Sequence, residues 1–211
     1  MTQPCIQQGW SVYPQKMAYI GYDVERKIID QRIYDDAMAH GFPPAFFRQS
    51  FFDHVTLYCV PDQQDCSLSV FQDCKFSVCR LCGVSFEKAS IYSSEFNTAE
   101  IADTLFHSAT IAHTHFRDCR IIKASFQEAR IQSSRMLDCV MEQIDYTDAT
   151  LDGCAFDRVK ADGIIGLHTA TITQGGATTE EVKRNREAVF RALAPPKQSQ
   201  RKKPQKVGHK R

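Results

Sequence analysis

The sequence predicts an all-β solenoid, and three observations support that fold class. From Phe71 to Phe156 a large apolar side chain falls on every fifth residue. The residue two positions before each of these is nearly always small, as at Ser69, Cys74 and Ala89. A period of five fits neither the 3.6-residue helix nor the two-residue strand, so it indicates short units that stack into a solenoid.

The repeated pattern is a small residue, a polar residue, then Phe, Ile or Leu, then two polar residues. In segments such as ASFQE ARIQS and ATLDG CAFDR it resembles the pentapeptide-repeat family, and the resemblance covers residues 45–166. It implies a right-handed quadrilateral β-helix with one pentapeptide per side, capped by helices at both ends. Residues 20 apart then lie above one another, which places aromatic columns on two opposite sides: Phe76, Phe96, Phe116, Met136, Phe156 and Phe86, Phe106, Phe126, Tyr146.

Residues 1–44 are expected to form the N-terminal cap. An aromatic segment, residues 1–22, precedes a predicted helix from Val24 to His40, with Asp23 as its N-cap and Gly41 beyond its end. Its inner face would consist of Val24, Ile28, Ile33 and Ala37.

The first coil is expected to be irregular. Phe47, Phe52 and Leu57 begin the five-residue spacing, but the frame returns one residue out of phase at Phe71. We interpret residues 58–66 as a loop that interrupts the coil.

Residues 167–194 are predicted to contain a final turn and an amphipathic helix from Thr178 to Ala194. Thr178 and Glu181 have the spacing of a capping box. Because a solenoid end exposes apolar core and unpaired strand edges, this helix either caps the last coil or joins two subunits. Gyrase-protecting members of the family dimerise through a carboxy-terminal element, so the resemblance implies a possible homodimer. The cap or dimer contact would use one apolar stripe: Val182, Val189, Phe190 and Leu193.

Residues 195–211 form a basic tail that we expect to be disordered, because it has almost no apolar side chains. Such a tail either binds nucleic acid or another polyanion through charge, or serves as a solubilising terminus. Its cations are Lys197, Arg201, Lys202, Lys203, Lys206, Lys210 and Arg211.

Composition and cysteine usage suggest a cytoplasmic protein. The 211 residues are 43% hydrophobic with a net charge of +1, and neither a membrane span nor a signal peptide is indicated. The repeat frame turns Cys79 inward and Cys82 outward, which argues against half a zinc site. Cys74, Cys119, Cys139 and Cys154 occupy inward small positions and are expected to be reduced.

Catalytic, cofactor and metal sites are not indicated. His113 and His115 are the best metal candidates, but they flank a corner and no third ligand is apparent. A wall of short outward side chains also offers no pocket, so no enzyme activity is expected.

The outer charges suggest two patterns. Two columns should alternate in sign and form salt-bridge ladders: Arg80, Glu100, Arg120 and Lys75, Glu95, His115, Arg135. Acids without partners should gather in the last coils as a surface for a protein partner: Asp138, Glu142, Asp145, Asp148, Asp152 and Asp157.

Two functions follow as hypotheses. The first is an interaction scaffold that binds a macromolecular partner through the solenoid, with the basic tail as an anchor on an anionic one. The alternative, implied by the resemblance, is a DNA mimic that binds a type II topoisomerase such as gyrase and gives quinolone resistance.

Overall fold

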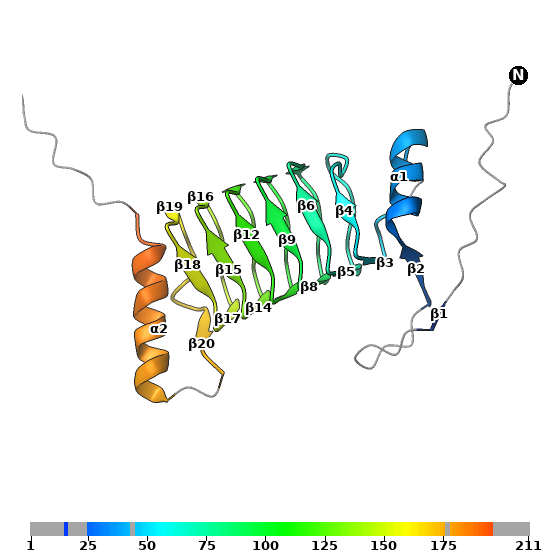
Figure 1. Cartoon of the computed structure of the whole chain (residues 1–211). Helices are drawn as coiled ribbons and strands as arrows, with labels where there is room; N and C mark the ends of the chain where they lie inside the picture. Colours follow the sequence, from blue (N-terminus) through cyan, green and yellow to red (C-terminus); the bar gives the residue numbers. More distant parts are fainter. Residues whose placement is uncertain (1–14, 17–24, 43–44, 176–177, 196–211) are drawn as a thin grey trace, which may run out of the picture.

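The chain folds into a four-sided parallel β-solenoid of about seven turns. Figure 1 shows this computed structural model, with stacked coils between an N-terminal helix and a C-terminal helix. The structure describes residues 15–16, 25–42, 45–175 and 178–195. Within these residues, no helix is long and apolar enough to cross a membrane.

The first side of the solenoid is a parallel sheet extended at its N-terminal edge by the antiparallel strand β1 (Gln15–Lys16). Its parallel strands are β2 (Glu25–Ile29), β3 (Ser50–Asp53), β5 (Val70–Gln72), β8 (Ser90–Tyr92), β11 (Thr110–Ala112), β14 (Arg130–Gln132), β17 (Thr150–Asp152) and β20 (Thr171–Thr173).

The second and third sides are shorter parallel sheets. The second side consists of β4 (Thr56–Leu57), β6 (Lys75–Ser77), β9 (Glu95–Asn97), β12 (His115–Arg117), β15 (Arg135–Leu137) and β18 (Ala155–Asp157). The third side consists of β7 (Arg80–Cys82), β10 (Glu100–Ala102), β13 (Arg120–Ile122), β16 (Val140–Glu142) and β19 (Lys160–Asp162). The fourth side forms single bridges, which join Asp65, Ser85, Leu105, Ser125, Asp145 and Ile165 in order.

The 20-residue register is the predicted one. Phe96 pairs with Phe76 and Phe116, and Ile101 pairs with Leu81 and Ile121. Ring centroids in the second-side column lie 4.3 Å apart for Phe76 and Phe96 and 4.5 Å apart for Phe96 and Phe116, with nearly parallel planes. Each large inward side chain therefore stacks on its counterpart in the next coil and excludes water from the core.

The inward small positions that carry a hydroxyl are satisfied by backbone carbonyls. Thr104 Oγ1 donates to the carbonyl of Leu81 at 2.9 Å, and Ser94 Oγ donates to that of Tyr92 at 2.8 Å. These groups are fully desolvated, so the bonds offset the cost of burying a polar atom.

The corners are left-handed turns. The second residue after each central residue has a positive φ, as at Asp118 (53°), His113 (52°) and Val78 (51°). Asp, Asn and Gly adopt this conformation readily, but a β-branched residue such as Val78 adopts it only with steric strain.

The N-terminal helix starts later than predicted. Residues 25–29 form β2, which pairs with β3, and helix α1 (Gln31–His40) begins after Asp30, whose side chain accepts the Ile33 N–H at 2.8 Å. The prediction of a helix from Val24 was wrong because the open edge of the first side offers backbone hydrogen bonds to residues 25–29. The predicted cap Asp23 and Val24 itself lie outside the described residues.

The inner face of α1 also differs from the prediction. Tyr34 and Ala37 are buried, Ile33 is half-buried, and Ile28 belongs to the strand. The Tyr34 hydroxyl donates to the Cys59 carbonyl at 2.6 Å and accepts the Cys59 N–H at 2.9 Å, which joins α1 to the first coil. Gly41 ends the helix as predicted, with φ 93°.

Residues 58–66 do not leave the coil as a loop, as the sequence suggested. Val60 and Cys66 are buried in the core, and Gln63 N–H donates to the Cys82 carbonyl at 2.7 Å. The frame shift arises because the third side of this coil is one residue shorter than in the others: Leu57 pairs with Phe76, 19 residues later, whereas Asp65 already bridges Ser85, 20 later.

The last coil is covered by α2 (Thr179–Ala192), which starts at the predicted capping box of Thr178 and Glu181. The helix packs on β18 and β20, and the Asn185 amide donates to the Thr173 carbonyl at 3.1 Å. Val189 and Leu193 join the buried core. The helix therefore acts as a cap on the solenoid.

Candidate interaction surfaces

The interior of the solenoid holds no group suited to catalysis. Among the described residues, the buried polar side chains are all hydroxyls: Ser50, Ser69, Ser94, Thr104, Thr114 and Ser134. Every charged side chain of this part of the chain is at least partly exposed, so any function of the solenoid lies on its outside.

The cysteines that face inward behave as small apolar residues. Cys79 is buried while Cys82 is only half-buried, so the two thiols of this pair lie on opposite sides of the wall. Burial raises the pKa of the Cys79 thiol to about 11 and that of Cys74 to about 12. At these pKa values the thiols are protonated at neutral pH, so they are poor nucleophiles and poor metal ligands.

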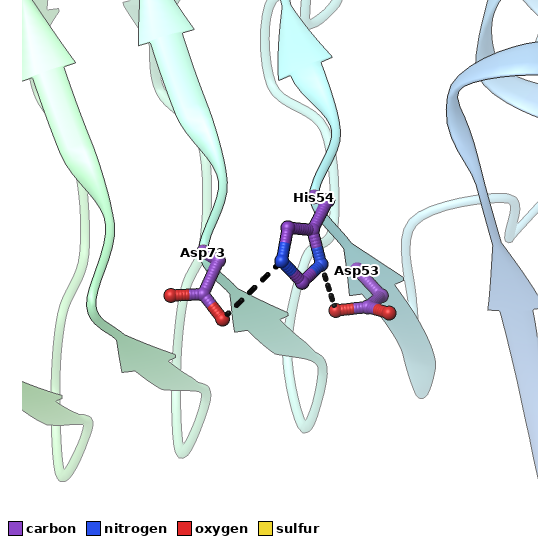
Figure 2. Close-up of side chains that lie close together, drawn as sticks. All are labelled: Asp53, His54 and Asp73. Carbon is purple, nitrogen blue, oxygen red and sulfur yellow. Dashed lines mark hydrogen bonds and ion pairs between the residues drawn. The ribbon is translucent and has the colours of Figure 1, made fainter.

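Three exposed side chains meet at the corner after β3 and β5. Figure 2 shows His54 between Asp53 and Asp73, with Nδ1 of the ring 2.7 Å from Asp53 Oδ1 and Nε2 3.9 Å from Asp73 Oδ2. The sequence analysis missed this group, because it arises where the shortened coil brings residues 19 apart into the same position. The carboxylates approach opposite ring nitrogens, so a metal on Nε2 would take only Asp73 as a second protein ligand. The imidazole is 73% exposed, and the arrangement suits an ion pair on the surface.

The histidines chosen from the sequence do not come together. His113 and His115 are both exposed and point away from the wall on either side of buried Thr114. Among the described residues, only Asp53, His54 and Asp73 meet the distance criterion for a metal cluster.

The salt-bridge ladders predicted within columns are not formed as such. The backbone register is as expected, with Glu100 between Arg80 and Arg120, but among the described side chains Glu100 makes no ion pair. Arg120 reaches Glu142, 22 residues later, at 3.9 Å. Arg135 likewise pairs with Asp157 rather than with Glu95. Long side chains cross diagonally to the next coil, where the flanking outward position holds a carboxylate.

The expectation that the late acids have no partners was wrong for three of them. Asp138 receives two hydrogen bonds from Arg158, at 2.6 and 2.7 Å, and Arg158 holds the pKa of this carboxyl below its usual value. Glu142 and Asp157 are the partners of Arg120 and Arg135. Sequence spacing of 20 did not reveal the two pairs that span 22 residues.

The remaining acids form what we call the acidic patch: Glu128, Asp145, Asp148 and Asp152. Within the described residues, none of the four makes an ion pair with Lys or Arg. Asp145 instead accepts hydrogen bonds from Thr147 and Gln127; burial opposes its ionisation, but these bonds lower its pKa overall. Asp152 accepts a hydrogen bond from the Thr173 hydroxyl at 3.0 Å.

The charge is distributed unevenly among the sides. The outward positions of residues 75–163 on the second and third sides hold four acids and four Lys or Arg each, so both sides are neutral. The fourth side, from Asp65 to His168, carries five acids and one lysine, Lys88. It also exposes two large apolar side chains, Leu105 (46%) and Ile165 (58%).

A hollow of about 370 Å³ lies at the N-terminal end of the fourth side. Its charges are already paired, since Arg48 contacts Asp65 at 2.9 Å and Lys88 contacts Glu87 at 3.4 Å. The hollow therefore offers no free charge for a ligand.

The predicted stripe of α2 divides between two roles. Val189 and Leu193 are buried against the last coil, Val182 is half-buried, and Phe190 is 37% exposed beneath Arg186, whose guanidinium carbon lies 5.6 Å from the ring centroid. The basic residues of the tail, Lys197 to Arg211, lie outside the described residues.

Residues 90–165 match the family model described as a pentapeptide repeat region. No curated protein matches the chain. Solved structures with the same kind of fold include a trypsin-treated variant of QnrB1, a plasmid-mediated fluoroquinolone resistance protein (12% identity, TM-score 0.34, 67% of this chain and 80% of that one). They also include Rfr23 from the cyanobacterium Cyanothece 51142 (10% identity, TM-score 0.29, 57% of this chain and 90% of that one).

A further similar structure is HetL, involved in heterocyst differentiation regulation, from Nostoc sp. strain PCC 7120 (12% identity, TM-score 0.25, 62% of this chain and 73% of that one). All three TM-scores are below 0.5, so the assignment rests on the repeat itself and on the family-model match. The five-residue period, the four-sided parallel solenoid and the match over residues 90–165 identify the chain as a pentapeptide-repeat protein.

Proposed function

We propose that the protein is a non-enzymatic interaction module. Its solenoid presents a surface to a macromolecular partner, and its basic tail, residues 195–211, attaches it to an anionic one. The observation that supports this proposal most strongly is the use of the interior: aromatic and aliphatic columns fill it, and the buried polar groups described are hydroxyls already bonded to carbonyls.

The distribution of charge supports a division of roles between the solenoid and the tail. The solenoid, residues 46–166, has a charge of −6, from 11 Lys and Arg and 17 Asp and Glu. The tail has seven Lys and Arg and no acid. A polyanion is attracted by the tail and repelled by the solenoid, so we assign polyanion binding to the tail.

The alternative is a DNA mimic that binds gyrase or another type II topoisomerase. The acidic patch favours it, because its carboxylates lack cationic partners in the described structure. The paired Asp138, Glu142 and Asp157 oppose it. Duplex DNA carries one negative charge per ~1.7 Å along its axis. A rod with two neutral sides imitates that density poorly.

A homodimer is part of the proposal. Val182 and Phe190 are the members of the predicted stripe that the last coil leaves partly exposed, and they would form the contact between two copies of α2. Sedimentation of the chain over a range of concentrations tests this contact, with Phe190→Ser as the variant that should remain monomeric.

The experiment that separates the scaffold from the mimic is supercoiling by purified gyrase, with and without a quinolone. We expect no inhibition and no protection from the drug at micromolar protein. Inhibition that weakens with salt, and that is lost on changing Glu142, Asp145, Asp148 and Asp152 to Gln or Asn, would favour the mimic. Those four side chains are partly or fully exposed, so their neutralisation should leave the fold intact.

A further inference from the structure

The acidic patch lies where the regular compensation of charge along the solenoid fails. Glu128 and Asp148 occupy the same corner position of consecutive coils, and the Glu128 N–H donates to the Thr147 carbonyl at 3.0 Å. Their backbones are therefore one coil apart, about 4.8 Å. Two carboxylates stacked in this way repel each other, and among the described residues neither one pairs with Lys or Arg.

Other acids are placed differently. Glu95 lies in register between Lys75 and His115, and Glu100 lies between Arg80 and Arg120. In the patch, the nearest base in register is Arg130, which pairs with Thr150 and makes no ion pair with the described residues. The patch is thus the part of the described surface where negative charge accumulates without a neighbouring cation in its columns.

The patch is also accessible. The side chain of Glu128 is 60% exposed, Asp148 is exposed, and Asp145 and Asp152 are half-buried. His107 approaches Glu128 at 3.7 Å, and Ser108 donates a hydrogen bond to it at 3.0 Å. These contacts orient the carboxylate and leave most of it open to a cationic segment.

We propose that the acidic patch is the docking surface for the chain's own C-terminal tail, residues 196–211. This inference builds on the proposed function, in which the same tail binds a polyanion. Charge complementarity points to this occupant, since the tail has seven cations and no acid. Docking on the patch keeps these cations away from a polyanion until the polyanion displaces them, so the solenoid regulates its own tail.

The tail can reach the patch. The last described residue, Pro195, follows α2, which packs on β20, and β20 pairs with β17, the strand that contains Asp152. Sixteen residues span up to about 50 Å when extended. The patch occupies two consecutive coils beside this end of the solenoid, separated by about 5 Å.

The direct test uses a labelled peptide of residues 196–211 and the chain truncated after Pro195, with no nucleic acid present. All described helices and strands precede this point. We expect the peptide to bind at 50 mM salt and to be released at 200 mM salt. Neutralising the patch (Glu128→Gln, Asp145→Asn, Asp148→Asn, Asp152→Asn) should weaken the affinity at least about five-fold.

The matched control removes four charges from the second and third sides: Glu95→Gln, Glu100→Gln, Asp103→Asn and Asp118→Asn. It should change the affinity less than about two-fold. Equal weakening by both variants, or none by the patch variant, would overturn the proposal. Should the patch variant not fold, the peptide with acetylated lysines provides a second test, since loss of its charge must abolish binding to the unmodified solenoid.

The full chain supplies the regulatory readout. Neutralising the patch should raise the affinity of the full chain for a short DNA duplex about three-fold or more, because the tail is released, and the control variant should not. A full chain that binds no DNA would refute the proposed function while the peptide result still decides the docking. Self-association that vanishes on tail truncation would show that the tail occupies a second copy, and would overturn docking within one chain.

Discussion

Asp138 and Arg158 occupy the same corner position of consecutive coils and form a two-point ion pair, with N···O distances of 2.6 and 2.7 Å. The pair neutralises an acid that the sequence offers as part of a DNA-like surface. It also shows how the solenoid uses its repeat, since a residue in one coil compensates a residue in the coil before it.

This pair predicts a pH dependence of stability. Arg158 lowers the pKa of Asp138 from its ordinary value of 3.8, so the folded state favours the ionised carboxyl. The stabilisation is present above pH 3.8 and disappears as the pH falls through the lower pKa of the folded protein. The melting temperatures of the wild type and Asp138→Asn should differ at neutral pH and converge toward pH 2. A difference that persists at pH 2 would contradict this assignment.

The aromatic columns predict a large cost for removing one ring. Phe116 is fully buried and stacks on Phe96 at 4.5 Å. Phe116→Ala should lower the free energy of unfolding by about 3–5 kcal/mol, because a ring-sized cavity remains. Leu105→Ala, at a position 46% exposed on the fourth side, is the control and should cost about 1 kcal/mol or less. Chemical denaturation of both variants measures the difference, and equal small losses would show that the columns do not carry the core.

The corners predict that one substitution stabilises the protein. Val78 is 78% exposed, has φ 51° and is β-branched, so its side chain is strained there. Asn tolerates this conformation, and Val78→Asn should add about 0.5–1 kcal/mol to the free energy of unfolding. Asp118→Asn, in the same column two coils later, starts from a residue that already suits the turn and should be neutral. A lower melting temperature for Val78→Asn would refute the strain.

Two glycines with positive φ should respond differently to alanine. A Cβ on Gly166 would lie 2.1 Å from the Thr147 backbone nitrogen, whereas at Gly153 the nearest atom, Ser133 Oγ, is 3.8 Å away. Gly166→Ala should therefore cost on the order of 2–4 kcal/mol, and Gly153→Ala about 1 kcal/mol or less. Thermal melting measures both. Similar losses at the two positions would mean that the close approach of the final coil at Thr147 is relieved by a small shift.

The fold was predictable because its repeat is strict. Each side chain in a five-residue frame has a fixed direction, so the columns of Phe96 and Phe106 followed from counting. The N-terminal cap was harder, since residues 25–29 have an amphipathic pattern compatible with a helix, and only the nearby edge of β3 favours a strand. The shortened coil at residues 58–66 was visible as a frame shift, but its sequence does not show whether the chain leaves the wall.

The candidate site was only partly predictable. Register gives the positions of charged residues, but it does not say which way a long side chain turns. Arg120 and Arg135 reach the outward carboxylates of the next coil, so Glu142 and Asp157 are paired while Asp145, Asp148 and Asp152 are not. Glu128 was missed because the count of late acids began at Asp138, although Glu128 lies directly below Asp148 in the 20-residue frame.

The measurement that tests the central claim most directly is the affinity for a short DNA duplex of the full chain and of the chain truncated after Pro195, between 50 and 200 mM salt. The full chain should bind and lose about 10³-fold in affinity over this range if most of its seven tail cations contact phosphates. The truncated chain should keep its melting temperature and show no binding. Salt-sensitive binding by the truncated chain would contradict the account, because polyanion recognition would then belong to the acidic solenoid.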